Sequence, residues 1–460
     1  MNLPRLILAD DVGNPKIVPA SIILIQAMKS SGMRLNLFMS SRREEDLRLL
    51  EALSGEPVCS VDTWTAGNAK NLKTLFQRRG TPDAVNVLSV PLGQGMEERV
   101  LQVYPEPLEL AKTLHCDILP LIRASASAAV STNRALSVLS SLSESGRETA
   151  RGLLFSSVKN PREFQLLEQE YNRRCPTLSL GYIPQNVERD MPAMSELSPR
   201  NMSMKLLQMR SAALQLGNGV RQVEWQIIEA LARLNETWPP MEPLKYPASH
   251  LNVAVINRDI ALEGEENSEA FRALGCSVSP CNPERDPFPA TADILYLPHV
   301  IADVAAARIL ENADFRQGLL KSVQGNKLIL ASGASAVLFG QHYRTASQNN
   351  LEGLGLFPFH AHHARKDGEL GVRRVEMRGT KDTYFTKMNE KLRGYEIGGF
   401  ALANPGNLGQ SCLAYRSMNA EAETGVSGWS HSYCFVTGLR LDLWSAMDVL
   451  YRWISLRKRK

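Results

Sequence analysis

Short runs of apolar residues alternate along the whole chain with longer stretches in which apolar positions recur at helical spacing. In the first half, the apolar runs are predicted strands and lie at residues 6–9, 35–38, 84–90, 118–122, 152–155 and 177–180. A predicted amphipathic helix at residues 17–31 follows the first run. Strands that alternate with helices are typical of a parallel sheet covered on both faces. The pattern therefore predicts an α/β fold.

The pattern is interrupted near the middle of the chain and then begins again. After a predicted helix at residues 202–234, the segment 236–247 holds four prolines, a density that neither a helix nor a central strand tolerates. Further strands are then predicted at residues 251–256, 294–297 and 327–331, with a helix at residues 267–274. We expect two domains, residues 1–235 and 251–460, joined by a proline-rich linker at residues 236–250. Each domain is expected to be a mostly parallel sheet with helices on both faces.

The overall composition is that of a globular protein, with 44% hydrophobic and 22% charged residues. The net charge is +4, and the tail at residues 457–460, which reads RKRK, accounts for it. The remainder is near neutral, so we expect no nucleic-acid-binding surface and interpret the tail as a solvated end. No apolar run approaches the roughly 20 residues of a membrane helix, and no signal pattern opens the chain. A cytoplasmic protein without a membrane segment is expected.

Cysteines and histidines provide few metal candidates. The seven cysteines include no C-x-x-C pair, which argues against a zinc site and a disulfide framework. His360, His362 and His363 form the densest histidine cluster. Imidazole groups can bind a metal ion or the axial position of a metallated tetrapyrrole, and the alternative is polar surface.

Several segments, in the same order along the chain, carry a resemblance to one enzyme family. Residues 54–64 (SGEPVCSVDTW) resemble the motif TGRPSxNLDxW, and residues 181–186 (GYIPQN) match GYLPRN. Residues 152–167 resemble GVILNRV…RHxxLL, residues 253–297 resemble a strand and helix that begin IAVARD, and residues 392–396 (LRGYE) resemble LRGHE. Together they are similar to cobyrinate a,c-diamide synthase and its hydrogenobyrinate counterpart, over essentially the whole chain.

This resemblance implies a fold and a reaction. The family joins an N-terminal domain related to dethiobiotin synthetase to a C-terminal domain of the class I-like glutamine amidotransferase type. It uses ATP and glutamine to amidate corrin-ring carboxylates, and it dimerises. The resemblance also implies a cleft large enough for a corrin or another tetrapyrrole.

The expected nucleotide loop departs from the family pattern. In a P-loop, backbone N–H groups wrap phosphate, and a Lys-Thr pair binds phosphate and magnesium. Here Gly13 and Lys16 are the remnants of that loop, whereas Pro15 replaces a glycine and Ile17 replaces the magnesium-binding hydroxyl. Proline removes a backbone donor and restricts φ. We therefore expect that this loop does not bind ATP and Mg²⁺, and a rearranged ATP site is the alternative.

A second magnesium position is altered as well. Ser89 or a neighbour stands where the family has an acidic residue, while Gly93 persists. Glu97 and Glu98 follow shortly after and are possible substitutes or ordinary surface acids.

The expected glutaminase site lacks both of its reacting groups. The family's nucleophilic cysteine falls on Gly333 or an immediate neighbour, in a turn with the sequence SGAS, and its histidine falls on Phe435. Ser332 and Ser335 would each need a base within hydrogen-bond reach, and Cys434 lies on the wrong element. We therefore expect that the chain does not hydrolyse glutamine.

These departures together predict a catalytically degenerate homologue. It would bind a corrinoid or another tetrapyrrole, with Tyr395 and Glu396 as candidate cleft residues, or act as a regulatory or structural subunit. A homodimer or a heterodimer with an active relative is expected. One alternative is a working ATP-dependent amidoligase of a tetrapyrrole carboxylate, using free ammonia, in cobalamin or related biosynthesis. Another is a scaffold without a ligand.

Overall fold

The computed structural model describes residues 2–460 except 12–15, 41–43, 98–99, 126, 145–146, 191–201, 236, 243–244, 365–372, 404–410, 419–422 and 459–460. Its contacts divide the chain into two compact units, with a main boundary between Glu242 and Pro243. Residues 64–71 and the described residues 202–205 group with the second unit although they precede that boundary. Among the described residues, none of the helices has both the length and the apolar character needed to span a bilayer.

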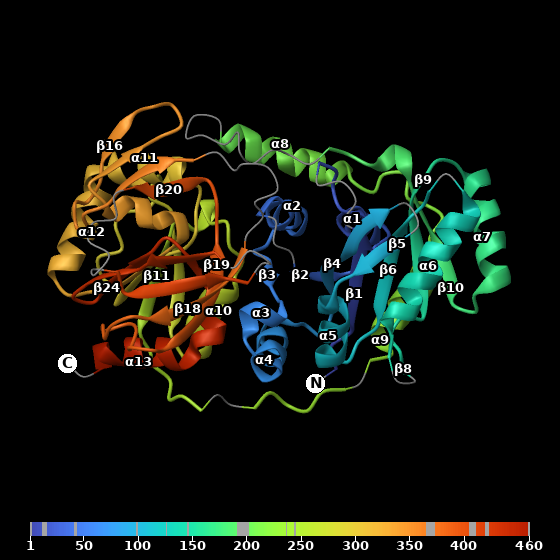
Figure 1. Ribbon diagram of the computed structural model, residues 1–460, viewed down its shortest axis with the longest axis horizontal. Coiled ribbons are helices and arrows are strands. Elements are labelled where there is room, and N and C mark those ends of the chain that lie inside the picture. The colour runs from blue at the N-terminus through green and yellow to red at the C-terminus, as the bar shows by residue number, and fades with distance from the viewer. Residues whose placement is uncertain are drawn as a thin grey trace. The chain divides into compact units, whose positions relative to one another are not determined.

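The first unit is built on an eight-stranded sheet in the order β10-β9-β6-β1-β4-β2-β3, with β5 paired to β4 (Figure 1). All pairs are parallel except β4 with β5. The strands are β1 Arg5–Asp11, β2 Leu35–Met39, β3 Cys59–Ser60, β4 Val85–Glu97, β5 Val100–Val103, β6 Ile118–Arg123, β9 Gly152–Val158 and β10 Leu178–Pro184. The predicted strands of this half are confirmed.

Helices connect these strands, as parallel pairing requires. They are α1 Ala20–Ser30, α2 Glu44–Ser54, α3 Thr63–Ala66, α4 Ala69–Arg79, α5 Pro105–Leu114, α6 Ala128–Leu142 and α7 Pro161–Arg174. A 3₁₀ turn at Gln185–Val187 and the helices α8 Met202–Gln215 and α9 Trp225–Arg233 follow the last strand, β10. A short hairpin joins β7 Ser143–Glu144 to β8 Arg147–Glu148.

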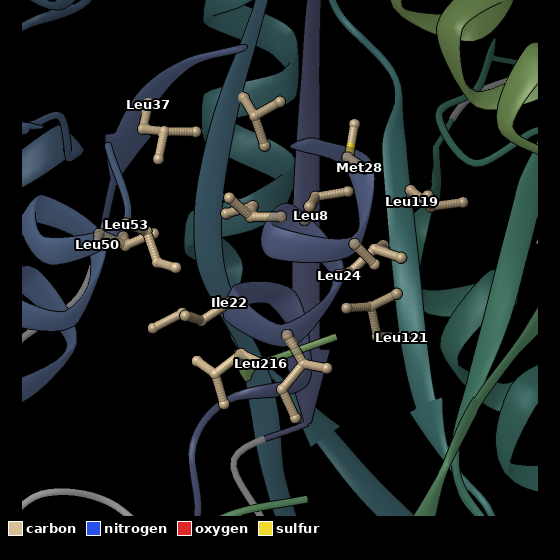
Figure 2. Packing of buried hydrophobic residues seen from close by; sticks show 14 of the residues in the cluster. Leu8, Ile22, Leu24, Met28, Leu37, Leu50, Leu53, Leu119, Leu121 and Leu216 are labelled. Carbon is tan, nitrogen blue, oxygen red and sulfur yellow. The ribbon is translucent and has the colours of Figure 1, made fainter. Parts of the chain in front are cut away.

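Both faces of this sheet carry apolar side chains, which explains its continuous apolar runs. On one face, Leu8 of β1 and Leu121 of β6 lie against Leu24 of α1 in one buried cluster (Figure 2). On the other face, Phe38 of β2 stacks on Phe76 of α4 with ring centroids 4.5 Å apart. The strands are therefore buried on both sides, as the sequence predicted.

Two helix predictions are wrong in their bounds. The helix expected from residue 17 begins at Ala20, because Pro19 is its N-cap and the residues before it are extended. The helix expected at residues 202–234 is two helices, α8 and α9. Gly217 between them has a φ of +76°, and a Cβ there would lie 2.8 Å from the backbone nitrogen of Ala27 in α1. The chain breaks here because it turns in close contact with α1.

The second unit is built on a six-stranded sheet in the order β12-β11-β13-β14-β24-β23. It is parallel except for the β23–β24 pair. The strands are β11 Asn252–Ile256, β12 Ser277–Cys281, β13 Ile294–Leu297, β14 Leu328–Ser332, β23 Trp429–His431 and β24 Cys434–Thr437. The α-helices are α10 Glu266–Ala273, α11 Ala302–Leu310, α12 Ala313–Gln324 and α13 Met447–Lys458, with 3₁₀ helices η3 Arg258–Ile260, η4 Gly333–Phe339 and η6 Leu443–Ala446.

Two further sheets in this unit were not predicted. One has the order β16-β15-β17-β20, with β15 His342–Arg344, β16 Asn350–Glu352, β17 His360–His363 and β20 Phe400–Ala403. The other is antiparallel, in the order β22-β21-β18-β19-β25, with β18 Arg373–Gly379, β19 Lys391–Glu396, β21 Leu413–Ser417, β22 Thr424–Ser427 and β25 Arg440–Leu441. The α/β class is confirmed, and the second unit adds these sheets to its parallel core.

Candidate functional site

Each unit has one candidate site, at the carboxyl edge of its parallel sheet. In the first unit the site lies where β1 leads toward α1. Asp10 at the end of β1 is buried, and its Oδ2 accepts the backbone N–H of Ser21 in the first turn of α1 at 3.2 Å. The hydroxyl groups of Ser21 and Ser89 are 2.8 Å apart. A carboxylate therefore lies at the amino end of α1, which is where a helix attracts an anion.

The described part of the loop before α1 is bonded to another segment. The backbone N–H of Val18 donates to the carbonyl of Arg189 at 2.9 Å, and Ile17 forms an antiparallel bridge with Asp190. Pro19 has no N–H to offer. This extended arrangement differs from a loop that wraps phosphate with successive N–H groups.

Only one of the two residues predicted as remnants of a phosphate loop is part of the described structure. Lys16 is exposed, and Gly13 lies outside the described residues. Glu98 and the side chain of Glu97 also lie outside the described part of the structure.

Burial dominates the electrostatics of this edge. It raises the pKa of Asp10 to about 7 against the hydrogen bond from Ser21, and nearby Asp46 adds to the rise. Burial also raises the pKa of Asp11, while Arg134 and Arg123 oppose the rise. Asp11 forms an ion pair with Arg134 of α6. Two carboxyl groups therefore occupy the edge that, in a P-loop protein, faces an anionic ligand.

In the second unit the site is the turn from β14 into η4. Gly333 has a φ of +66° at this turn. A strand that passes through a left-handed turn into a helix is the geometry that exposes a nucleophile in many α/β hydrolytic enzymes. Gly333 stands at the point of the turn where such a nucleophile would be.

The space in front of Gly333 is filled by His299, from the loop after β13. A Cβ built on Gly333 would lie 2.8 Å from the Cβ of His299, 2.9 Å from its Nδ1 and 2.8 Å from the Cδ1 of Ile397. The backbone N–H of Ala334 donates to the Nδ1 of His299 at 3.2 Å. In nucleophile turns, the N–H after the nucleophile is the one that stabilises an oxyanion. One imidazole thus occupies both the side-chain position and the oxyanion donor.

The serines beside this turn are hydrogen bonded to the backbone. Ser335 Oγ donates to the carbonyl of Pro298 at 2.5 Å. Ser332 Oγ accepts the N–H of Leu441 at 2.9 Å. Neither has an imidazole partner in these contacts, which a serine nucleophile needs.

Phe435, predicted at the histidine position, is an interior residue of β24. It pairs in register with Leu330 and stacks on Phe385 at 4.6 Å between ring centroids. Thr437 lies opposite Ser332 instead, and its hydroxyl is 3.0 Å from that of Ser427. The Thr437 hydroxyl also accepts the backbone N–H of Leu439 at 3.2 Å, so these contacts are with its own strand's surroundings and not with Gly333.

Sequence reasoning did not identify His299, although a signal for it exists. It follows the predicted strand at residues 294–297 by two residues, and the carboxyl ends of parallel strands meet at one edge. A polar residue directly after the neighbouring strand is therefore a candidate for the same site as Gly333.

A buried polar network supports the loop that holds His299. The backbone N–H of His299 donates to Glu263 Oε2 at 3.3 Å, and the hydroxyl of Tyr296 also donates to Glu263. Burial raises the pKa of Glu263 to about 7, with Arg440 opposing the rise. Arg440 itself pairs with Glu266 at 2.7 Å. This network holds the loop after β13 in position.

Tyr395 and Glu396, the candidate cleft residues, point to opposite faces of β19. Tyr395 is buried, with its hydroxyl 3.5 Å from Thr65 Oγ1. Glu396 accepts a hydrogen bond from Tyr415 at 3.3 Å. Their described contacts are within the protein, and they do not converge on one surface.

The predicted histidine cluster is also divided between two faces of its strand. His363 Nδ1 lies 3.6 Å from Asp303 of α11. His360 is on the other face, and its ring lies 5.6 Å from that of His342. In the part of the chain that the structure describes, no group of three or more His, Cys, Asp or Glu residues could hold a metal ion.

No family model matches the chain. It is 21% identical over 379 residues to a cobyrinate a,c-diamide synthase of Listeria monocytogenes serotype 4b (strain F2365), covering 81% of this chain and 82% of that protein. It is also 21% identical over 380 residues to a hydrogenobyrinate a,c-diamide synthase of Stutzerimonas stutzeri (strain A1501), covering 82% and 84% respectively. A solved glutamine amidotransferase aligns with 45% of this chain and 99% of its own at 11% identity and a TM-score of 0.34.

Proposed function

We propose that this chain, a distant relative of the cobyrinate and hydrogenobyrinate a,c-diamide synthases, is a non-catalytic member of that group. It keeps the α/β architecture and binds a corrinoid or another tetrapyrrole, as a homodimer or as the regulatory subunit of an active relative. It forms no amide bond.

The observation that carries this proposal is the imidazole of His299 in front of Gly333. A glutaminase needs a nucleophile at the turn and a free N–H for the oxyanion. Here a side chain at Gly333 would collide with the Cβ of His299, and the N–H of Ala334 is already bonded to its Nδ1. A cysteine cannot simply be restored at this position, because the loop after β13 fills the space.

The nucleotide edge of the first unit also supports the absence of amide formation, because it is unfavourable for a phosphate group. Asp10 provides a carboxylate at the amino end of α1, where a nucleotide phosphate would have to bind. Its charge repels phosphate when it is ionised. When it is protonated, the carboxyl group still occupies the N–H of Ser21.

The ligand part of the proposal derives from the relatives. Their names identify cobyrinate and hydrogenobyrinate as the compounds that they amidate. A large ring ligand is bound by shape and a few polar contacts, which do not depend on catalytic groups. Binding can therefore persist where catalysis has been lost.

Two measurements on the purified protein test the catalytic part. We expect no release of glutamate from glutamine above the background without protein. We also expect no heat of binding when Mg-ATP is titrated into the protein in a calorimeter. An active a,c-diamide synthase serves as the positive control for both. Glutamate release at a rate comparable to the control, or saturable Mg-ATP binding, would overturn the proposal.

A further inference from the structure

One face of the antiparallel sheet in the second unit carries mostly basic side chains. Opposite residues of antiparallel strands share a face, and alternate residues along each strand return to it. On this face Arg378 of β18 pairs with Lys391 of β19, and Glu376 pairs with Arg393 of β19 and Arg416 of β21.

The other face of the same strands is the interior. Val375 and Met377 of β18, Leu392 of β19 and Leu413 of β21 are all buried. The basic side chains are thus held in a fixed register by a sheet whose opposite side is packed. Their spacing is roughly 5 Å across the strands and roughly 7 Å along them.

Positive charge on this face is in large excess. We define the basic face as the side chains of Arg374, Arg378, Lys391, Arg393 and Arg416. Glu376 is the acidic residue within it, and its Oε2 lies 3.6 Å from Arg416. Within the described residues, Arg378 and Lys391 are exposed and have neither an ion-pair nor a hydrogen-bond partner. The chain without its tail is near neutral, so this concentration is local.

An aromatic ring lies at one end of the basic face. The indole of Trp64 has the guanidinium of Arg393 at 4.7 Å and that of Arg374 at 5.8 Å from its centre. Its Nε1 donates to the carbonyl of Gly394 at 3.1 Å. Cation–π contacts of this kind keep the two guanidinium groups at fixed positions beside the exposed cations.

Apolar side chains border the same face at its other edge. Met418 directly follows β21, and Val426 of β22 pairs with Ala414 of β21. They are 44% and 40% exposed, respectively. The surface therefore offers cations together with apolar contact area.

We propose that the basic face binds the carboxylate groups of a multiply carboxylated tetrapyrrole. This proposal rests on the proposed function and assigns its ligand to a surface away from the turn at Gly333. Carboxylates at the rim of the ring meet the exposed cations, and guanidinium groups bind carboxylates in a planar, bidentate geometry. The ring contacts Met418 and Val426.

Titration of uroporphyrin, a tetrapyrrole with carboxylates around its rim, into the full chain tests this assignment. The test variant combines Arg378→Gln, Lys391→Gln and Arg416→Gln. A matched control, Arg285→Gln with Lys321→Gln and Arg344→Gln, removes the same charge from exposed positions elsewhere in the second unit. A charge-keeping variant, Arg378→Lys with Arg416→Lys, tests whether the face still folds and binds.

We expect the test variant to bind uroporphyrin about tenfold more weakly, because it loses three exposed charge contacts. The control variant should bind uroporphyrin like the native chain. Equal binding by the test variant would overturn the assignment while leaving tetrapyrrole binding intact. Absence of binding by the native chain to uroporphyrin and to cobyrinic acid would contradict the ligand part of the proposed function as well. Benzenehexacarboxylate carries carboxylates without a tetrapyrrole ring and provides a charge-only comparison. If it binds as tightly as uroporphyrin, the basic face is not a tetrapyrrole-specific site.

Discussion

Gly333 combines a left-handed backbone with a side-chain position that is already filled. Its φ of +66° is a conformation that costs other residues roughly 1–2 kcal/mol. In a working nucleophile turn, the protein tolerates that strain because the side chain reaches a substrate. In this chain glycine removes the strain, and His299 occupies the space in front of the turn.

A double-mutant cycle tests this occlusion. We expect Gly333→Cys to lower the free energy of unfolding by about 3 kcal/mol, from backbone strain and from overpacking against the Cβ of His299. In a His299→Gly background, which removes that Cβ, the same substitution should cost about 1–3 kcal/mol less. Urea denaturation of the four proteins gives the coupling energy. Additive effects of the two substitutions would show that His299 does not fill the position.

Glu263 makes the stability of the second unit depend on pH. Burial raises its pKa from 4.5 to about 7 in the folded protein, so the folded state binds the proton more tightly than the unfolded state. The resulting stabilisation is complete below the unfolded-state pKa and is lost as the pH rises through the folded-state pKa.

The variant Glu263→Gln removes this ionisation. Between about pH 5 and about pH 8, the native chain should lose on the order of 2 kcal/mol of unfolding free energy relative to the variant. Denaturant titrations at the two pH values measure this difference. The exposed Glu311→Gln control should show no comparable change. An equal pH dependence of native chain and Glu263→Gln would contradict the buried, protonatable state.

The sequence was sufficient to find a position where an expected catalytic residue is absent. It was not sufficient to find the side chain from another strand that fills the space at that position. Gly333 follows directly from the strand-to-turn pattern of residues 327–335. The part played by His299 depends on which strands lie next to each other, because β13 borders β14 through pairing that no local pattern encodes. Asp10 directly follows the predicted strand at residues 6–9, but its bond to Ser21 became apparent only from the position where α1 begins.

The secondary-structure elements were predictable where burial on both faces produces long apolar runs. The central strands of both parallel sheets were found in this way. The single helix expected at residues 202–234 was wrong, because its apolar spacing continues through the break between α8 and α9. The strands of the two added sheets are short, and several of them pair with strands that are not adjacent in sequence, so their pattern is weak.

The break between α8 and α9 leads to a prediction about two glycines. Gly217 and Gly55 share a φ of +76°, but a Cβ on Gly217 would lie 2.8 Å from the backbone nitrogen of Ala27, and a Cβ on Gly55 would have no atom within 4 Å. Both alanine substitutions should incur the backbone strain of roughly 1–2 kcal/mol. Gly217→Ala should cost a further 1–3 kcal/mol, approximately the cost of overpacking, because a backbone must move.

Thermal or urea denaturation of Gly217→Ala and Gly55→Ala separates the two effects. If both variants lose the same stability, the close contact between the α8–α9 turn and α1 does not exist in solution.

For the whole molecule, the division into two units does not follow chain order alone. Residues 64–71 belong to the second unit, where the side chain of Asn71 donates to the carbonyl of Trp444 at 2.9 Å and that of Arg393 donates to Gly67 at 3.2 Å. A linear reading assigns this segment to the first domain, because nothing in its composition marks a long-range contact. Trp64 within it supplies the aromatic ring of the basic face.

The altered carboxyl edges of the two parallel sheets concern different steps of one reaction. Asp10 lies at the amino end of α1, where a phosphate would bind, and His299 lies at the turn where glutamine would be hydrolysed. An ammonia-using ligase would avoid the second obstacle but still need the first site. We therefore predict that the chain makes no amide from either nitrogen donor.

This loss of amide formation is tested by incubating the protein with cobyrinate, Mg-ATP and either glutamine or ammonium, followed by mass spectrometry of the corrinoid. An active a,c-diamide synthase run in parallel shows that the substrate and conditions are sound. We predict that cobyrinate is recovered unchanged with both nitrogen donors, while the control converts it to the diamide. Formation of cobyrinate a,c-diamide by this chain with either donor would show that the chain is a working amidoligase.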